Sequence, residues 1–197
     1  MPIPHITITP AAPIIDEVLT PNAAAAYVDT PRPNISKLLA ATYLQDLSMS
    51  SLEPLRKADF VSAGKQLPLI QTAPAEESTD EWRNWWGDAP TLSDEDWLNA
   101  QRGDWTGASP ERIAKVGYLL VGLGGIITGV TKVSRAVPSG HPRKARFELE
   151  LLGRLTGDLR SNQKTFPETP SDEEQLFAFN LVGKRYKPLA GGSVMWL

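Results

Sequence analysis

A glycine-rich stretch near the centre of the sequence has residues that could bind a phosphate. The stretch GYLLVGLGG, residues 117–125, reads as a strand that runs into a Gly-x-Gly-Gly turn. In a dinucleotide-binding turn, such glycines let the backbone approach a pyrophosphate at the N-terminus of the following helix. The third glycine of that motif is replaced here by Ile127 or Thr128, and only 72 residues follow Gly125. Close packing of the backbone is therefore the favoured interpretation, and nucleotide binding through segment 122–125 is the alternative.

The remaining residues give little indication of acid–base catalysis, nucleophilic catalysis or metal binding. The acids Asp94, Glu95 and Asp96 follow one another, so their side chains point in different directions rather than at one reacting atom. The two histidines, His5 and His141, have no acid or second histidine at ligand spacing, and the chain contains no cysteine. We therefore expect a protein that is not an enzyme and that takes no cofactor, metal ion or small-molecule substrate.

Charge is distributed unevenly along the chain, although the net charge is only −3. Residues 1–108 contain 7 basic and 15 acidic side chains, a net charge of −8. Residues 109–197 contain 13 basic and 8 acidic side chains, a net charge of +5. The strongest basic segment contains five cations and no acid: Lys132, Arg135, Arg143, Lys144 and Arg146. Because the chain as a whole is acidic, we expect this segment to contact an acidic protein surface rather than nucleic acid. An anionic membrane surface stays open as an alternative, since an apolar run over 116–131 directly precedes the segment.

Six tryptophans are many for a chain of this length, and five of them fall within residues 82–105. Clustered indoles either form a small core or supply the anchors of a binding surface. The second interpretation predicts a docking face with an acidic rim, made of Trp82, Trp85, Trp86, Asp94, Glu95, Asp96 and Trp97. Such a face would attract a basic partner, for example the basic segment of another copy of the chain.

The first 34 residues are predicted to form an extended arm. Seven prolines interrupt every helix or central strand that this segment could form. A segment of this kind cannot bury enough apolar surface to fold alone. It carries isoleucines that a neighbouring chain could bury: Ile3, Ile6, Ile8, Ile14 and Ile15. We therefore expect the arm to be fixed by contact with another molecule.

The elements that would position these residues are expected to be mostly helices. Apolar spacing predicts helices within residues 35–64 and from Thr79 to Gly103, with Ser93 as a cap in the second range. Another helix is expected to start at Ser109-Pro110-Glu111. A capping box of Ser171 and Glu174 predicts a last helix, which ends at Gly183.

Strands are expected in fewer places. Alternation of apolar and charged residues predicts a strand over 143–152, and short strands are expected at 66–71 and in the last residues. The apolar run over 116–131 fits either one helix or a strand–turn–helix. The polar segment 72–78 contains a proline and is a candidate linker within the domain. The predicted fold class is therefore α+β, with a helix-rich domain over 35–197, a few short strands and the preceding arm.

These patterns favour a structural role over a catalytic one. We expect a non-catalytic subunit of a larger assembly, specifically a virion component such as a capsid-associated, neck or matrix-like protein. Copies of itself or other subunits would be the partners, held by the arm and by the acidic and basic segments. The first residues do not resemble a signal peptide, which favours a cytoplasmic or virion location. A peripheral membrane-binding matrix-type protein is the main alternative, and a nucleotide-binding protein is the second.

Overall fold

A computed structural model describes residues 16–106, 109–137, 144–189 and 193–197 of the 197-residue chain. Seven strands form one sheet in the order β4-β7-β6-β5-β1-β9, with β8 also paired to β7. Neighbouring strands are antiparallel except for β1 and β5, which are parallel. The strands span Pro68–Gln71 (β1), Trp105–Thr106 (β4), Tyr118–Leu123 (β5), Ile126–Val137 (β6), Lys144–Leu155 (β7), Lys164–Thr165 (β8) and Val194–Trp196 (β9).

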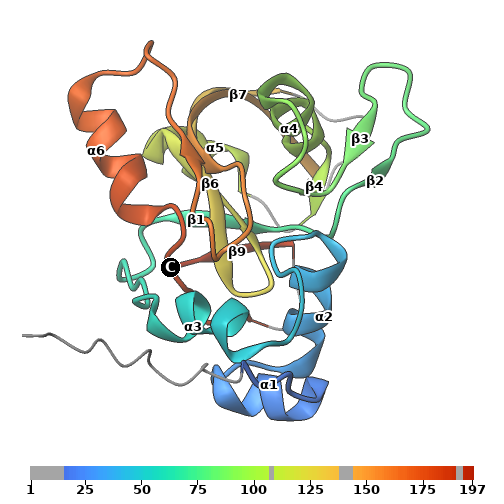
Figure 1. The fold of residues 1–197 in the computed structure, drawn as a ribbon. Coiled ribbons are helices and arrows are strands. Elements are labelled where there is room, and N and C mark those ends of the chain that lie inside the picture. Colours follow the sequence, from blue (N-terminus) through green and yellow to red (C-terminus); the bar gives the residue numbers. More distant parts are fainter. Residues whose placement is uncertain (1–15, 107–108, 138–143, 190–192) are drawn as a thin grey trace, which may run out of the picture.

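The sheet curves until its two ends almost meet (Figure 1). Ser193, which directly precedes β9, places its Oγ 2.9 Å from both the Oγ1 and the carbonyl oxygen of Thr106 in β4. Because β4 and β9 are the first and last strands of the order, this contact nearly closes the sheet into a barrel-like shape. The strong twist of long antiparallel strands such as β6 and β7 is the physical cause of such curvature.

The predicted fold class is wrong, because the protein is not helix-rich. Helices make up 29% and strands 30% of the described residues, which form a mixed α/β structure built around one large sheet. Most of the difference comes from the run over 116–131, which forms β5, a turn and β6 rather than one helix or a strand–turn–helix. Gly124 and Gly125 have φ values of +60° and +90°, which a tight hairpin turn between paired strands requires and which glycine adopts without strain.

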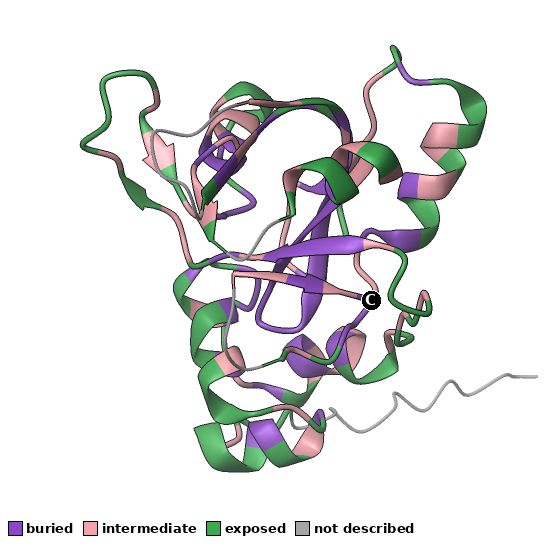
Figure 2. Ribbon diagram, turned by 180° about the vertical axis from the view of Figure 1, so that it is seen from behind, coloured by how far each residue is buried: buried purple, intermediate pink, exposed green. Residues whose placement is uncertain are grey.

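Helices cover both faces of the sheet. The largest core lies between the sheet and a first group of helices: α1 (Pro21–Tyr27), α2 (Arg32–Ala40), α3 (Met49–Lys57) and α6 (Asp172–Leu181). The other face packs against α4 (Asp94–Gln101) and α5 (Pro110–Val116). The alternation of β5 shows the division, because Leu120 belongs to the largest core whereas Leu119 and Val121 belong to the cores on the opposite face. Figure 2 shows the buried residues concentrated in the strands.

Several local predictions are confirmed. Ser93 caps α4 by accepting a hydrogen bond from the amide of Asp96, and Ser171 and Glu174 form the complete capping box of α6. α5 begins at Pro110 as expected, and β7 buries one side and exposes the other along most of its length. Short strands also occur at β1 and β9.

The helix predicted to start at Thr79 is absent, and this prediction is wrong. Its place is taken by a hairpin of two short strands, β2 (Glu76–Glu77) and β3 (Trp85–Trp86). Gly87 follows with φ +90°, and a Cβ on it would lie only 2.8 Å from the carbonyl oxygen of Ala73. The close approach of these two backbones therefore sets the direction of the hairpin. The predicted linker 72–78 is part of this structure, since the amide of Ala75 donates to the carbonyl of Asp88 at 3.0 Å.

The prediction of an extended arm fails for its second half. Residues 1–15 lie outside the described residues, and the isoleucines at positions 3, 6, 8, 14 and 15 lie there too. Residues 16–34 are largely helical and pack on their own chain, with Ala24 and Val28 fully buried in the largest core. A capping threonine, a proline at the first helical position and four consecutive alanines favour this short helix. The prolines therefore begin helices α1 and α2 instead of preventing them.

Candidate functional site

An open groove with a volume of about 630 Å³ lies between the β2–β3 hairpin and the edge of the large sheet. We name it the tryptophan groove, and its main lining residues are Pro74, Trp82, Arg83, Trp86, Trp105 and Arg146. Trp82 and Trp86 come from the hairpin, whereas Trp105 and Arg146 come from β4 and β7. Figure 1 shows how the hairpin stands apart from the sheet beside α4 and β4. A second pocket shares Lys37, Gln71 and Thr72 with the groove, which is therefore continued toward α2.

Two indoles remain exposed in this groove although they are held in place. The exposed fractions of Trp82 and Trp86 are 44% and 52%. The Nε1 of Trp86 donates to the carbonyl oxygen of Glu77 at 3.2 Å, across the hairpin. The guanidinium carbons of Arg83 and Arg146 lie 4.7 and 5.3 Å from the ring centroid of Trp82. Rigid, half-exposed aromatic side chains of this kind are typical anchors of binding surfaces.

Helix α4 connects the two walls of the groove. Its residue Gln101 donates from Nε2 to the carbonyl of Gly87 at 2.7 Å and accepts at its own carbonyl from Nε1 of Trp105, also at 2.7 Å. Arg83 donates to the carbonyl of Ala100 at 3.2 Å. The spacing of the walls is therefore fixed by the last turn of one short helix.

Both arginines of the groove are paired with carboxylates. Arg83 forms an ion pair with Asp80 at 2.7 Å, and Arg146 forms one with Asp104 at 3.1 Å. Lys144 also lines the groove. Because its arginines already have carboxylate partners, the groove is suited to an apolar or weakly charged chain rather than to a polyanion.

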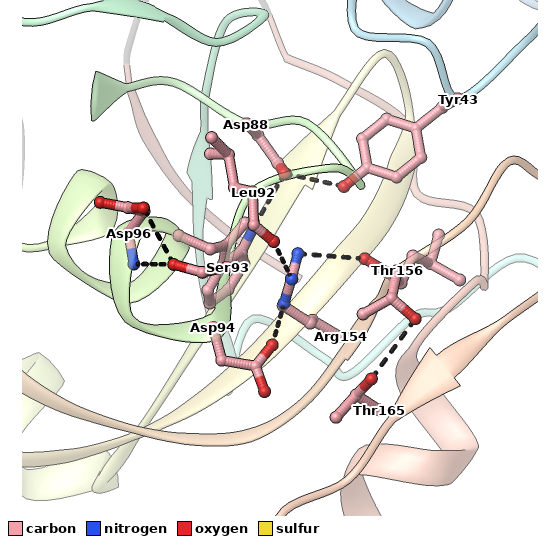
Figure 3. Close-up of polar contacts among 11 residues, drawn as sticks. Tyr43, Asp88, Leu92, Ser93, Asp94, Asp96, Arg154, Thr156 and Thr165 are labelled. Carbon is pink, nitrogen blue, oxygen red and sulfur yellow. Dashed lines mark hydrogen bonds and ion pairs between the residues drawn. The ribbon is translucent and has the colours of Figure 1, made fainter. Parts of the chain in front are cut away.

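A buried carboxylate holds the hairpin beneath this groove (Figure 3). Asp88 is fully buried and accepts hydrogen bonds from the Tyr43 hydroxyl at 2.8 Å, from Nε1 of Trp97 at 2.7 Å and from the Thr128 hydroxyl. Burial raises the pKa of Asp88, and its three donors and the charge of Arg154 offset this only in part. Burial and the neighbouring Asp88 charge also raise the pKa of Tyr43 well above its usual value. Both carboxylate oxygens of Asp88 are engaged by the chain's own donors, so this network positions the hairpin rather than performing chemistry.

Arg154 extends the network toward α4. Its side chain is almost fully buried and forms an ion pair with Asp94 at 2.6 Å, and it also donates to the carbonyl of Leu92. Its guanidinium carbon lies 5.8 Å from the ring centroid of Trp97 (Figure 3 shows the polar contacts). Trp97 packs so closely on β6 that a Cβ on Gly129 would lie 2.5 Å from its ring. The first turn of α4 is thereby attached to the sheet.

The residues of the predicted acidic tryptophan face do not form one surface, because they lie in different parts of the structure. Trp82 and Trp86 line the groove, whereas Trp97 is fully buried in the core. Trp85 packs half-buried against the core below α4. The three acids lie in the first turn of α4, where Asp94 bonds Arg154, Asp96 bonds Ser93 and Asn84, and Glu95 is exposed. The structure therefore brings only two of the seven residues together in the groove.

The basic segment pairs with acids of its own chain. Lys132 lies 2.8 Å from Glu174, Arg135 lies 2.6 Å from Glu148, and Arg146 pairs with Asp104. Lys144 lines the groove, and Arg143 lies outside the described residues. Most of the predicted positive surface is consequently neutralised within one molecule.

The glycine-rich segment lacks the geometry of a nucleotide site. Gly124 and Gly125 form a hairpin turn, and a strand follows them where the motif needs a helix N-terminus. Gly122 faces the ring of Tyr186, which a Cβ would approach to 2.5 Å. In the part of the chain that the structure covers, no helix has the length and apolar character needed to cross a membrane. Within the same ranges, no three His, Asp or Glu side chains are grouped so as to hold a metal ion.

Comparison with protein-family models, curated proteins and solved structures found no match. The site is therefore interpreted from its geometry alone. The sequence did not indicate that Tyr43, Asp88, Thr128 and Arg154 act together, because they lie far apart in the chain and no local pattern connects them. The sequence held one signal for Asp88: it directly follows Gly87 and comes shortly after three tryptophans.

Proposed function

We propose that the chain is a non-catalytic structural subunit that assembles with copies of itself, and that the tryptophan groove of one copy holds residues 1–15 of another. The observation that carries this proposal is the pair of half-exposed indoles, Trp82 and Trp86, held over an open groove. Leaving two such side chains in water is unfavourable, and covering them stabilises a complex.

The chemistry of residues 1–15 fits this groove. The segment contains four prolines, five isoleucines and no acidic or basic side chain other than His5. Proline-rich segments favour the polyproline II conformation and dock in grooves lined by aromatic side chains with a low entropy cost. A groove whose arginines are already paired matches such a nearly uncharged occupant.

The occupant is assigned to a second copy because of where the segment is attached. Asp16 accepts hydrogen bonds from the amide and the hydroxyl of Ser50, at the start of α3. Figure 1 places α1 and α3 at the opposite end of the molecule from the β2–β3 hairpin. If residues 2–13 occupied the hairpin end of the groove of their own chain, two residues would have to bridge this separation, and two residues span only about 7 Å. Exchange between copies avoids this limit and links them head to tail.

The sequence led us to expect that the acidic and basic segments join one copy to another, but this proposal gives them a role within each subunit. They stabilise the subunit from within, because Arg146 of the basic segment pairs with Asp104, and Asp94 of the acidic face pairs with Arg154, which lies outside the basic segment. Recognition between copies is assigned to the groove and to residues 1–15. A virion as the assembly concerned stays a prediction, as does the membrane-binding alternative.

The proposal is tested by measuring mass in solution by sedimentation velocity over a range of protein concentrations. The full chain is expected to associate, whereas deletion of residues 1–15 and the double variant Trp82→Ala, Trp86→Ala are each expected to remain monomeric. Phe179→Ala removes an aromatic side chain that is 57% exposed on α6, outside the groove, and serves as the matched control. Association that persists in both the deletion and the double variant would refute the proposal, and so would a monomeric full chain.

A second measurement separates the groove from other effects of the variants. A synthetic peptide of residues 1–15 is added to the chain that lacks them, and tryptophan fluorescence is recorded. Binding is expected with the deleted chain, and it is expected to be lost when Trp82 and Trp86 are also replaced. A peptide with its four prolines replaced by alanine is expected to bind more weakly, because it loses its preference for the extended conformation.

A further inference from the structure

A separate open pocket of about 410 Å³ is lined by residues from separate segments of the chain. Its cations are Lys57 at the end of α3, Arg160 between β7 and β8, Lys164 on β8 and Lys184 after α6. Asp59 is the one acid among the described lining residues. We name this set of residues the basic pocket. It shares no lining residue with the tryptophan groove.

Two of the four cations have carboxylate partners and two do not. Lys184 forms an ion pair with Asp59, and Lys57 lies 3.1 Å from Glu53. Within the described part of the chain, no oxygen accepts a hydrogen bond from the Lys164 ammonium, whose recorded contact is with the ring of Phe179 at 5.3 Å. The guanidinium of Arg160 forms no ion pair among these residues, but it lies near enough to Asp16 and Asp46 for its charge to lower the pKa of both carboxyl groups. Among the described residues, Lys164 is therefore the cation of this pocket that has no acidic neighbour on record.

Lys164 is held in a position that is unfavourable for an ammonium group. It is partly buried and packs against Gly183, where a Cβ would lie 3.6 Å from its Nζ. Burial and the charge of Lys184 lower the pKa of Lys164. A cation that is desolvated and lies beside a second cation is stabilised when an anion enters between them.

We propose that the basic pocket binds a phosphate-type oxyanion, which Lys164 and Arg160 contact directly while Lys57 and Lys184 lie at its rim. A tetrahedral dianion offers several acceptor oxygens, so it can bond an ammonium and a planar guanidinium at the same time. The volume of the pocket falls in the range of small-molecule sites, about 300–1,000 Å³. This site is independent of the assembly proposed above, because its residues lie outside the tryptophan groove.

The first test uses inorganic phosphate and measures thermal unfolding at constant ionic strength, with chloride as the replaced anion. Phosphate that binds only the folded state raises Tm, and above its Kd the stabilisation grows with the logarithm of the phosphate concentration. Isothermal titration then gives the affinity of each variant. Lys164→Gln and Arg160→Gln are each expected to weaken phosphate binding by about tenfold or more, the scale of one charge-assisted hydrogen bond. Lys115→Gln removes an exposed charge on α5, outside the pocket, and is expected to leave the affinity unchanged.

A readout at the site itself distinguishes binding from general charge effects. Phosphate is expected to raise the pKa of Lys164, measured by NMR of the side chain, because the anion stabilises the ammonium form. Affinity should fall as the pH rises through that pKa. The proposal is overturned if Lys115→Gln weakens phosphate binding as much as Lys164→Gln does.

The same oxyanion chemistry can come from a free phosphate or from a lipid headgroup, and a vesicle assay separates these sources. The chain is sedimented with vesicles of phosphatidylcholine alone and of phosphatidylcholine mixed with phosphatidic acid. Binding to the mixed vesicles that is lost in Lys164→Gln identifies a headgroup ligand. Binding of inorganic phosphate without vesicle binding identifies a free anion. Failure of both arms refutes the site.

Discussion

Replacement of Asp88 by alanine is expected to destabilise the protein more than most single substitutions. The carboxylate accepts hydrogen bonds from three donors, on Tyr43, Trp97 and Thr128, and it is fully buried. A buried donor that loses its acceptor costs about 1–3 kcal/mol. Three such donors add up to about 3–6 kcal/mol once partial relaxation and non-additivity are allowed for. That loss is a large part of the total stability of a domain, about 5–15 kcal/mol.

Asp88→Asn is the matched control for this experiment. The amide oxygen keeps an acceptor for Tyr43 and Trp97, and the amide nitrogen can donate to the Thr128 hydroxyl. The Thr128 hydroxyl can then donate to the carbonyl of Val121, which lies 3.3 Å away. We therefore expect asparagine to cost less than about 1.5 kcal/mol at neutral pH.

The same pair of proteins predicts a pH dependence with a definite sign. Because burial raises the pKa of Asp88 above its usual value near 3.8, the folded state binds the proton more tightly than the unfolded state. The part of the stability that is linked to protonation of Asp88 is then fully present below pH 3.8 and is lost as the pH rises through the raised pKa of the folded state. The stability of the wild type relative to Asp88→Asn should therefore decrease from acidic to neutral pH.

The assay is urea unfolding followed by tryptophan fluorescence at several pH values, with the free energy of unfolding extrapolated to water. A cost for Asp88→Ala that is no larger than that for Asp88→Asn would refute the role of the three donors. A difference between wild type and Asp88→Asn that is constant with pH would refute the raised pKa.

Three further substitutions test the packing and the caps by the same unfolding measurement. Gly129→Ala is expected to cost about 1–3 kcal/mol and to lower Tm, because its Cβ would overlap the ring of Trp97; an unchanged Tm would contradict the close packing. Arg154→Met is expected to lower the free energy of unfolding by about 1–3 kcal/mol, because the hydrogen bonds and the ion pair of Arg154 are buried. Arg135→Met breaks an exposed ion pair and should lower it by less than about 1 kcal/mol. Equal losses in the two variants would contradict this distinction between buried and exposed pairs. Ser171→Ala is expected to cost about 1 kcal/mol through loss of the N-cap of α6, and Ser171→Gly only a few tenths; equal stability of the alanine variant and the wild type would remove the cap from the argument.

Features that depend on neighbours in the sequence were predictable. Ser93 caps α4 and the Ser171–Glu174 box begins α6, since each cap involves residues only three positions apart. The alternation in β7 was also visible, because one side of the strand is buried and the next residue is not. The structure of the apolar run over 116–131 was not predictable from the sequence. An apolar segment that is buried on both faces shows no hydrophobic periodicity that distinguishes a helix from a strand.

The candidate site was predictable only in part. The sequence pointed to tryptophans as anchors, and two of them, Trp82 and Trp86, line the groove. It gave no means of telling these from Trp97, which is fully buried, because exposure depends on what packs against each ring. The basic pocket was missed for a similar reason, since Lys57, Lys164 and Lys184 are far apart in the chain and no local charge run contains them.

The sequence by itself determined the helix caps, the strand alternation, the absence of cysteine chemistry and the unequal distribution of charge. The tertiary structure decided that opposite charges pair within one molecule and that the ends of the sheet nearly meet. It also decided that Asp88 is fully buried and accepts the hydrogen bonds that hold the β2–β3 hairpin in place. The physical reason is that caps and alternation arise from contacts within one or two turns. Burial and ion pairing arise from residues that only strand pairing and core packing bring together.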